Sequence, residues 1–251
     1  MYTHQLETFR KIKNGSDVVL HAPTGGGKTI AGFVPSIVDF VKKPSSFKAI
    51  HTLYVSPLKA LAADIKRSLL IPINDLKLSI KVDVRTSDTS PYAKSKQLKK
   101  PPNFLITTPE SFALLMARRD ARIFFRHLKF LIIDELHTFF ASKRGHLLTL
   151  NIARLQSMRT FQLIGLSATL SNKQIAKDFL SSKNITELVS ARNIVSPSLT
   201  ILDSQHRLPW SGHSPRYALQ DIYKKILNHK TTILFVNTRA QAELLFQGLW
   251  S

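Results

Sequence analysis

Short apolar runs rich in β-branched residues alternate along the chain with longer amphipathic segments. This alternation predicts repeated strand and helix units, which assemble into a parallel sheet with helices on both faces. The fold class is therefore α/β. In open parallel sheets, ligands bind at the carboxyl ends of the strands, so the turns that follow the strands are the expected site of chemistry. The expected strands are Val18 to His21, Thr52 to Ser56, Phe104 to Thr107, Phe130 to Asp134 and Leu163 to Ser167.

The pattern changes beyond the last of these strands and indicates how the chain divides into domains. We expect a first domain over residues 1–195 and an interdomain linker over 196–216, because a proline-containing stretch there is too irregular for a helix and too long for a turn. A helix-like segment, Tyr217 to Leu227, and an apolar strand, Ile233 to Val236, then follow. They predict a second domain over 217–251 that has begun and is unfinished.

The charge of the chain narrows the class of partner. Lys and Arg number 36 against 16 Asp and Glu, which gives a formal net charge of +20. A surface of this sign attracts polyanions such as DNA, RNA or anionic lipid, and charge alone does not select among them. The chain has no cysteine, no apolar leader at its N-terminus and no apolar run of the roughly 18 residues that a transmembrane helix needs. We expect a cytoplasmic protein with no membrane partner.

A glycine-rich turn, Ala22-Pro-Thr-Gly-Gly-Gly-Lys-Thr29, lies between the first strand and an apolar helix expected from Ile30 to Val41. This is the context of a phosphate-binding loop, in which backbone N–H groups surround the phosphates, Lys28 reaches the β and γ oxygens and Thr29 holds magnesium. Ala22 replaces the first glycine of the general pattern. The turn predicts ATP and Mg²⁺ as cofactors, bound by Pro23, Thr24, Gly25, Gly26, Gly27, Lys28 and Thr29.

A second chemical motif is Phe130-Leu-Ile-Ile-Asp-Glu-Leu-His137, an apolar strand that ends in two carboxylates. Taken alone, such a pair is usually a solvated strand end. With the phosphate loop upstream, Asp134 is expected to coordinate magnesium and Glu135 to orient and deprotonate the attacking water. His137 lies beside the carboxylates, where a role in coupling is expected. The predicted catalytic residues are therefore Lys28, Asp134, Glu135 and His137.

Four further stretches join these two motifs in a fixed order, and together they resemble the DExH-box helicases of superfamily 2. Each stretch resembles one helicase motif: Ser56-Pro-Leu-Lys-Ala-Leu61 resembles motif Ia, Thr107-Thr-Pro-Glu-Ser111 resembles motif Ib, Ser167-Ala-Thr169 resembles motif III, and Ile233 to Arg239 resembles motif IV. The resemblance implies a RecA-like first domain of the P-loop NTPase type and the start of a second. ATP would bind between the two domains, and a nucleic-acid strand would lie across both.

The resemblance also assigns roles to single residues. It implies that Gln5 reads adenine and that Ser167, Ala168 and Thr169 couple hydrolysis to movement. Arg144 either extends the nucleic-acid track or is an ordinary surface arginine. For the hydroxyls of motif Ib, helix capping is the alternative to phosphate binding. The expected contacts to a single strand are Ser56, Pro57, Lys59, Thr107, Thr108, Pro109 and Ser111.

Longer stretches resemble the large helicase-related group and, within it, bacterial helicases associated with a DNA ligase. Ser87 stands where the group usually has glycine, and Leu136 stands where the ligase-associated members tend to have tryptophan. The subgroup implies DNA as partner, a role in DNA repair and association with a ligase and a nuclease. The stretches are Arg85-Thr-Ser-Asp-Thr-Ser90, Ser142-Lys-Arg-Gly145, Leu208-Pro-Trp-Ser-Gly-His213 and Asn237-Thr-Arg-Ala-Gln-Ala-Glu-Leu244.

Three functions are compatible with these motifs. The first is an ATP-dependent DNA helicase or translocase, acting on single-stranded DNA or DNA with single-stranded tails. The second is an RNA helicase, because the motifs hold the sugar-phosphate backbone and discriminate poorly between the two polymers. The third is a nucleotide-gated binding module without productive hydrolysis. The resemblance places an arginine finger in motif VI, outside this chain, so we expect the 251-residue chain by itself to bind ATP weakly and hydrolyse it poorly.

Overall fold

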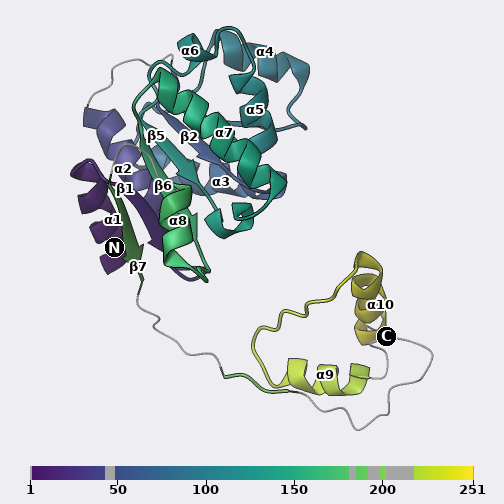
Figure 1. The fold of residues 1–251 in the computed structure, drawn as a ribbon. Coiled ribbons are helices and arrows are strands. Elements are labelled where there is room, and N and C mark those ends of the chain that lie inside the picture. Colours follow the sequence, from purple (N-terminus) through teal and green to yellow (C-terminus); the bar gives the residue numbers. More distant parts are fainter. Residues whose placement is uncertain (1, 43–48, 181–184, 192–197, 202–217, 251) are drawn as a thin grey trace. The chain divides into compact units, whose positions relative to one another are not determined.

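The computed structural model describes residues 2–42, 49–180, 185–191, 198–201 and 218–250. The chain separates into two compact units, Met1–Ile194 and Val195–Ser251, and each is described by itself. Of the expected linker over 196–216, only 198–201 is described, and Leu208 to His213 lies outside the described residues. The first unit contains the sheet (Figure 1).

The first unit is built on a seven-stranded sheet with the order β3-β4-β2-β5-β6-β1-β7, and every pairing in it is parallel. This confirms the predicted α/β fold class. All five expected strands are present, but β3 and β7 were not expected. These two form the edges of the sheet, and their partly exposed, partly polar residues give no apolar run. The strands are β1 (Asp17–His21), β2 (Thr52–Val55), β3 (Val82–Arg85), β4 (Phe104–Thr107), β5 (Phe130–Ile133), β6 (Gln162–Ser167) and β7 (Thr186–Ser190).

Helices cover both faces of the sheet (Figure 1). The strands bury side chains on both sides, as expected for a parallel sheet between two helical layers. One core includes Leu20 and Ile132 with residues of α1, α2 and α3; the other includes Leu53 and Leu131 with residues of α5, α6, α7 and α8. The helical segments are α1 (Thr3–Lys13), α2 (Lys28–Lys42), α3 (Lys59–Asp75), α4 (Pro91–Lys99), α5 (Pro109–Met116), α6 (Ala121–Phe124), the 3₁₀ helix η1 (Leu136–Phe139), α7 (Lys143–Met158) and α8 (Lys173–Phe179).

The order of the strands divides the carboxyl edge of the sheet into two regions. The loops after β1, β5 and β6 are neighbours, since β6 pairs with both β1 and β5. The loops after β3, β4 and β2 are also neighbours, because β4 pairs with both β3 and β2. The pairing of β2 with β5 joins the two regions. The phosphate loop and the Asp-Glu pair therefore lie in one region, and motifs Ia and Ib lie in the other.

The second unit contains α9 (Leu219–Leu227) and α10 (Arg239–Trp250). The helix expected up to Leu227 is present from Leu219, but the strand expected from Ile233 to Val236 was wrong: these residues form no strand. A strand needs a neighbouring strand for its ladder of hydrogen bonds. The described residues of this unit contain no strand that could pair with Ile233 to Val236. Over the described residues as a whole, no helix combines the length and apolar character that a membrane crossing requires.

Candidate nucleotide site and nucleic-acid surface

The glycine-rich turn forms a closed loop at the start of α2. Gly25 and Gly27 have φ of 79° and 70°, in the left-handed region that favours glycine. Gly26 donates its N–H to the Pro23 carbonyl at 3.0 Å, and a Cβ on Gly26 would lie 2.9 Å from that oxygen. Lys28 is buried, and its Nζ also donates to the Pro23 carbonyl, at 3.2 Å. The lysine is thus held inside the loop, where a phosphate can replace the carbonyl as its partner.

Ala22, at the position where the general pattern has glycine, lies at the end of β1 and not in the turn itself. Its N–H donates to the Ser167 carbonyl at 3.1 Å, and its side chain is buried in the core. An alanine methyl group fits this packed position, and the residue needs no left-handed conformation. The departure from the general pattern therefore leaves the geometry of the loop intact.

The N-terminal helix α1 lies against the phosphate loop through two side chains. Gln5 is buried; its Nε2 donates to the Gly27 carbonyl at 3.2 Å, and its Oε1 accepts from the Tyr2 N–H at 2.8 Å. His4 Nε2 lies 2.7 Å from the Gly26 carbonyl oxygen. The structure thus brings Gln5 to the loop, with both ends of its amide engaged by the chain. Its contact with adenine stays a prediction. For this contact, the Gln5 amide would have to give up its bonds to Tyr2 and Gly27 and bond to the adenine instead.

The two carboxylates follow β5 directly. The Asp134 N–H donates to the Val55 carbonyl at 2.9 Å, and Asp134 Oδ1 accepts from the Glu135 N–H at 2.9 Å. Glu135 has a left-handed backbone with φ of 44°, which is uncommon for a residue other than glycine and turns the chain sharply after the strand. Burial raises the pKa of Asp134 above its ordinary value, although Tyr54 and Lys28 act in the opposite direction. A cation bound here would favour the ionised carboxylate.

His137 connects the Asp-Glu pair to the loop after β6. Its Nδ1 lies 2.8 Å from Ser167 Oγ and 3.5 Å from Glu135 Oε2. Ser167 Oγ donates its single proton to the Thr169 carbonyl at 2.7 Å, so it must accept from His137, and Nδ1 carries a proton. Ala168 lies between Ser167 and Thr169 in the sequence and has no polar side chain. Sequence reasoning expected a coupling role for these residues, and the structure shows the bonds that connect them.

The polar groups of the site fit a magnesium nucleotide. The structure has three buried side-chain polar atoms without a hydrogen-bond partner among the described residues, and two of them, Tyr54 Oη and Glu135 Oε2, lie here. Within the same residues, no group of three or more His, Cys, Asp or Glu could hold a metal ion. Magnesium at phosphate sites takes only one or two protein oxygens, and phosphates and water complete its shell. Thr29 and Asp134 supply such a pair.

In the other region of the edge, the hydroxyls of motifs Ia and Ib are buried and bonded within the chain. Thr107 Oγ1 donates to the Arg85 carbonyl at 2.8 Å, and Ser56 Oγ donates to the Leu58 carbonyl at 3.1 Å. Thr108 caps α5 by accepting from the Ser111 N–H at 3.4 Å. Capping, one of the two roles considered for these residues, is thus present in the structure. Pro57 and Pro109 are buried, and Lys59 is exposed at the start of α3.

A cavity of about 260 Å³ opens beside motif Ib and has a basic lining. Lys59 Nζ lies 2.9 Å from Asp88 Oδ1, and Lys94 Nζ donates to the Ser87 carbonyl at 3.0 Å. Both contacts are exposed and readily exchanged for a phosphate. The lining residues are Lys59, Arg85, Ser87, Lys94, Thr108, Glu110, Ser111 and Leu114. In the sequence, the stretch from Arg85 to Ser90 indicates only a resemblance to the subgroup and gives no sign of this cavity.

Arg144, at the start of α7, joins motif Ia to motif Ib. Its Nε donates to Glu110 Oε1 at 2.6 Å, and its NH2 donates to Glu110 Oε2 at 3.3 Å and to the Pro57 carbonyl at 2.8 Å. Burial alone would raise the pKa of Glu110, but the hydrogen bond and charge of Arg144, together with hydrogen bonds from the Glu110 backbone and Thr108, lower it below its ordinary value. Arg144 thus fixes motif Ia against motif Ib. The sequence contained no signal for this pairing, because the partners lie 34 and 87 residues away.

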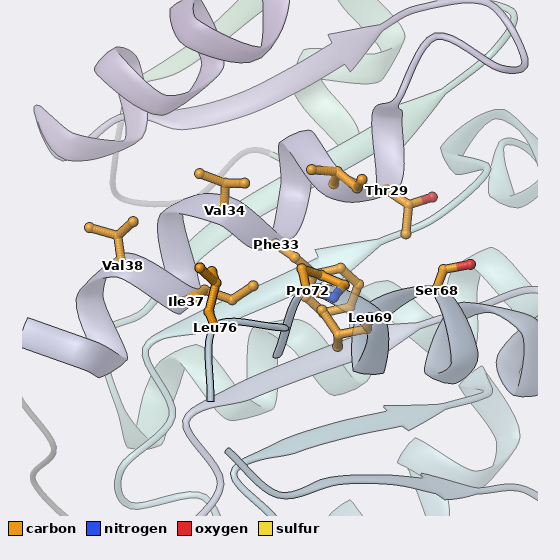
Figure 2. Close-up of a pocket in the computed structure, with 10 residues that line it drawn as sticks. Thr29, Phe33, Val34, Ile37, Val38, Ser68, Leu69, Pro72 and Leu76 are labelled. Atoms are coloured by element: carbon orange, nitrogen blue, oxygen red, sulfur yellow. The ribbon is translucent and has the colours of Figure 1, made fainter. Parts of the chain in front are cut away.

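A second cavity, of about 220 Å³, lies between α2 and α3 (Figure 2). Thr29 and Ser68 are the polar residues of its lining, and the remainder is apolar. A phosphate would find few donors in it, so it is distinct from the nucleotide site although Thr29 borders both. Its lining consists of Thr29, Ile30, Phe33, Val34, Ile37, Val38, Ser68, Leu69, Pro72 and Leu76.

Comparison with known proteins agrees with this geometry. The family model described as DEAD/DEAH box helicase matches residues 2–177. An ATP-dependent helicase Lhr-Core from Sulfolobus acidocaldarius is 37% identical over 92% of this chain, and the Lhr helicase/uracil glycosylase of Escherichia coli is 31% identical over 96% of it. The chain spans 28% and 18% of the length of these two relatives.

Among solved structures, a Mycobacterium smegmatis helicase Lhr bound to ssDNA and AMP-PNP is similar, with a TM-score of 0.81 and 31% identity. The similarity covers 99% of this chain and 33% of that one. The resemblance to superfamily 2 and to the large helicase-related group is confirmed. The names of these three relatives mention no ligase, so the association with a ligase and a nuclease stays a prediction.

Proposed function

Because the chain belongs to the DEAD/DEAH box helicase family, we propose that it carries the ATP-hydrolysing unit of a DNA helicase or translocase. The observation that carries this proposal is the hydrogen bond of 2.8 Å between His137 and Ser167. It connects the loop that holds the Asp-Glu pair to the loop of motif III, and a motor needs such a connection between hydrolysis and movement.

The nucleotide site supports hydrolysis by positioning and electrostatics. Lys28 would exchange the Pro23 carbonyl for the phosphates of ATP, with the N–H groups at the start of α2 around them. Thr29 and Asp134 would hold magnesium, which neutralises charge on the phosphate oxygens when it is bound with ATP. Glu135, whose Oε2 has no hydrogen-bond partner among the described residues, would accept a proton from the attacking water. An arginine from a complete second domain would be required for full turnover.

The region around motifs Ia and Ib suits the backbone of a single strand. Lys59, Lys94 and the N-termini of α3 and α5 offer positive charge and N–H groups at one edge of the sheet, and the formal net charge of +20 adds a general attraction. Such contacts position a strand without reading its sequence. DNA is favoured over RNA because the Mycobacterium smegmatis structure is described with ssDNA. A role in DNA repair is consistent with the uracil glycosylase in the name of the Escherichia coli relative.

The test is ATP turnover by the longest natural form of the protein, without nucleic acid and with single-stranded DNA or RNA of equal length. We expect strong stimulation by DNA and loss of turnover in Lys28→Ala. Lys177→Ala, a change of an α8 lysine outside both regions of the edge, serves as the matched control. Equal stimulation by RNA would overturn the choice of DNA. No stimulation by either polymer would overturn the motor and leave a nucleotide-gated binding module.

A further inference from the structure

Tyr54 occupies an unusual place for a tyrosine, in the middle of β2 and almost fully buried at 1% exposure. Its ring stacks on Phe33 of α2, with 4.9 Å between the ring centroids and an interplanar angle of 10°. Phe33 also lies in the lining of the apolar cavity between α2 and α3 (Figure 2). The ring of Tyr54 is therefore held by packing, and its hydroxyl has one fixed direction.

The register of the sheet decides what this hydroxyl faces. Tyr54 is paired with Ile132 across β2 and β5, and Asp134 lies two residues beyond Ile132 on the same face of the sheet. The backbone N–H of Asp134 donates to the Val55 carbonyl at 2.9 Å, so the ends of the two strands stay together. The hydroxyl of Tyr54 lies near Asp134 and Thr29, the two residues that fit a magnesium ion, but makes no hydrogen bond of good geometry to either.

The Tyr54 hydroxyl has no hydrogen-bond partner of good geometry among the described residues, although it is buried. A buried hydroxyl without a partner destabilises the folded protein, so its presence calls for a reason. A tyrosine hydroxyl carries a proton at neutral pH and can donate one hydrogen bond.

We propose that Tyr54 is a positioning residue of the nucleotide site, whose hydroxyl donates to the Asp134 carboxylate and keeps it oriented toward magnesium. Asp134 Oδ1 already accepts from the Glu135 N–H at 2.9 Å. A donor from β2 would fix the carboxylate from a second direction. The proposal rests on the proposed magnesium role of Asp134, and it assigns Tyr54 no contact with the reacting atoms. Groups that orient a ligating carboxylate strongly affect metal affinity.

The variant Tyr54→Phe tests this inference because it removes one oxygen and keeps the ring that stacks on Phe33. The measurement is the binding of a fluorescent ATP analogue by anisotropy, with Mg²⁺ titrated in one series and EDTA present in the other. We expect the half-saturating Mg²⁺ concentration to rise about 10-fold or more. Affinity in EDTA and the melting temperature should change little, because the ring and its stacking on Phe33 are retained.

Tyr92→Phe is the matched control, since Tyr92 is 79% exposed on α4 and loses the same oxygen. Asp134→Asn should lose the dependence on Mg²⁺ altogether. A half-saturating Mg²⁺ concentration within about twofold of wild type in Tyr54→Phe would overturn the proposal. An equal loss of affinity in EDTA with a lower melting temperature would also overturn it, because it would indicate a structural role.

Absence of any Mg²⁺ effect in the wild type would overturn the magnesium role of Asp134 and, with it, this inference. The assay contains no nucleic acid and needs no turnover. Failure of this inference is therefore distinguishable from failure of the proposed motor function, which is measured by stimulation of ATP turnover.

Discussion

His137 and Ser167 are joined by a hydrogen bond of 2.8 Å in which the imidazole Nδ1–H is the donor and the serine Oγ the acceptor. The direction follows from the second bond of Ser167, which donates its only proton to the Thr169 carbonyl. The chain of bonds therefore runs from the loop after β5 to the backbone of the loop after β6. A displacement of His137 by the nucleotide would reach Thr169 through a single intermediate residue.

Ser167→Ala removes the middle of this chain of bonds. We expect the ratio of DNA-stimulated to basal ATP turnover to fall about 2–10-fold, which corresponds to the net value of one hydrogen bond, about 0.5–1.5 kcal/mol. Ser157→Ala, at an exposed serine whose hydroxyl donates to the Arg154 carbonyl of the same helix α7, is the matched control. A cycle with His137→Ala completes the test. If the two effects add fully, the residues do not act through this bond.

Glu135→Gln tests the assignment of the base. Glutamine has nearly the same shape and tolerates the turn after β5 equally well, but it cannot accept the proton of water. We expect ATP turnover to fall by about 10²–10⁴-fold while binding of the nucleotide is retained. Both are measured on the longest natural form of the protein. Turnover within about tenfold of wild type would contradict the role of Glu135 as base. A wild-type protein no faster than the variant would favour a nucleotide-gated module.

Arg144→Ala should weaken the nucleic-acid surface without affecting the nucleotide site. The variant removes the hydrogen bonds to both oxygens of Glu110 and to the Pro57 carbonyl, which hold motif Ia against motif Ib. We expect the affinity for single-stranded DNA, measured by anisotropy, to fall by up to about fivefold, because an exposed ion pair contributes about 0.2–1 kcal/mol.

The matched control for Arg144→Ala is Arg154→Ala, a change of an exposed arginine on the same helix. Arg144→Lys should restore little of the affinity for DNA that Arg144→Ala loses, because a lysine cannot donate two parallel hydrogen bonds to a carboxylate. Equal affinities of Arg144→Ala and Arg154→Ala for DNA would show that Arg144 is an ordinary surface arginine.

The sequence predicted the parts of the fold that depend on local pattern. The central strands are buried on both faces and read as continuous apolar runs, so β1, β2, β4, β5 and β6 were found. The edge strands β3 and β7 are half-exposed and carry charged residues such as Asp83 and Glu187, which hide the pattern. The error at Ile233 to Val236 has the opposite cause: the segment is apolar, but β structure requires a partner strand, and local sequence cannot supply one.

The candidate site likewise contains features that local sequence predicts and features that depend on the fold. The positions of the phosphate loop and of the Asp-Glu pair were predictable, because their chemistry requires particular residues at consecutive positions. The contacts of Arg144 and Tyr54 were not, since their partners come from other elements and are brought close only by the fold. In the sequence, Tyr54 is indistinguishable from the other residues of a buried strand. A role for its hydroxyl is indicated only by the register of β2 and β5, which places Asp134 on the same face of the sheet.

His51, at the start of β2, provides a prediction about pH. The ring is buried; its Nε2 lies 2.9 Å from Asp39 Oδ2 and its Nδ1 lies 3.0 Å from Thr52 Oγ1. Burial lowers the pKa of His51 below the ordinary 6.5, although Asp39 opposes the change. Burial would raise the pKa of Asp39, but hydrogen bonds from Lys129 and His51 lower it overall, below 3.8. The folded protein therefore holds a neutral His51 beside an ionised Asp39 near neutral pH.

Between the lowered pKa of folded His51 and about 6.5, the unfolded chain binds more protons at this residue than the folded chain does. The free energy of unfolding should therefore fall as the pH drops below about 6.5, while the contribution of Asp39 is lost only at more acidic pH, below about 3.8. The check is the difference in melting temperature between neutral and mildly acidic pH. His51→Asn should reduce this difference although it lowers stability at every pH.

His127→Asn is the comparison variant. Burial and the neighbouring Arg126 and Arg159 also lower the pKa of His127, but its side chain is more exposed than that of His51 and solvent screens its charge. We expect a smaller change in the pH dependence from this variant than from His51→Asn. An unchanged pH dependence in His51→Asn would mean that the buried ring accepts a proton in the folded state as readily as in the unfolded chain, and that Asp39 compensates fully for its burial.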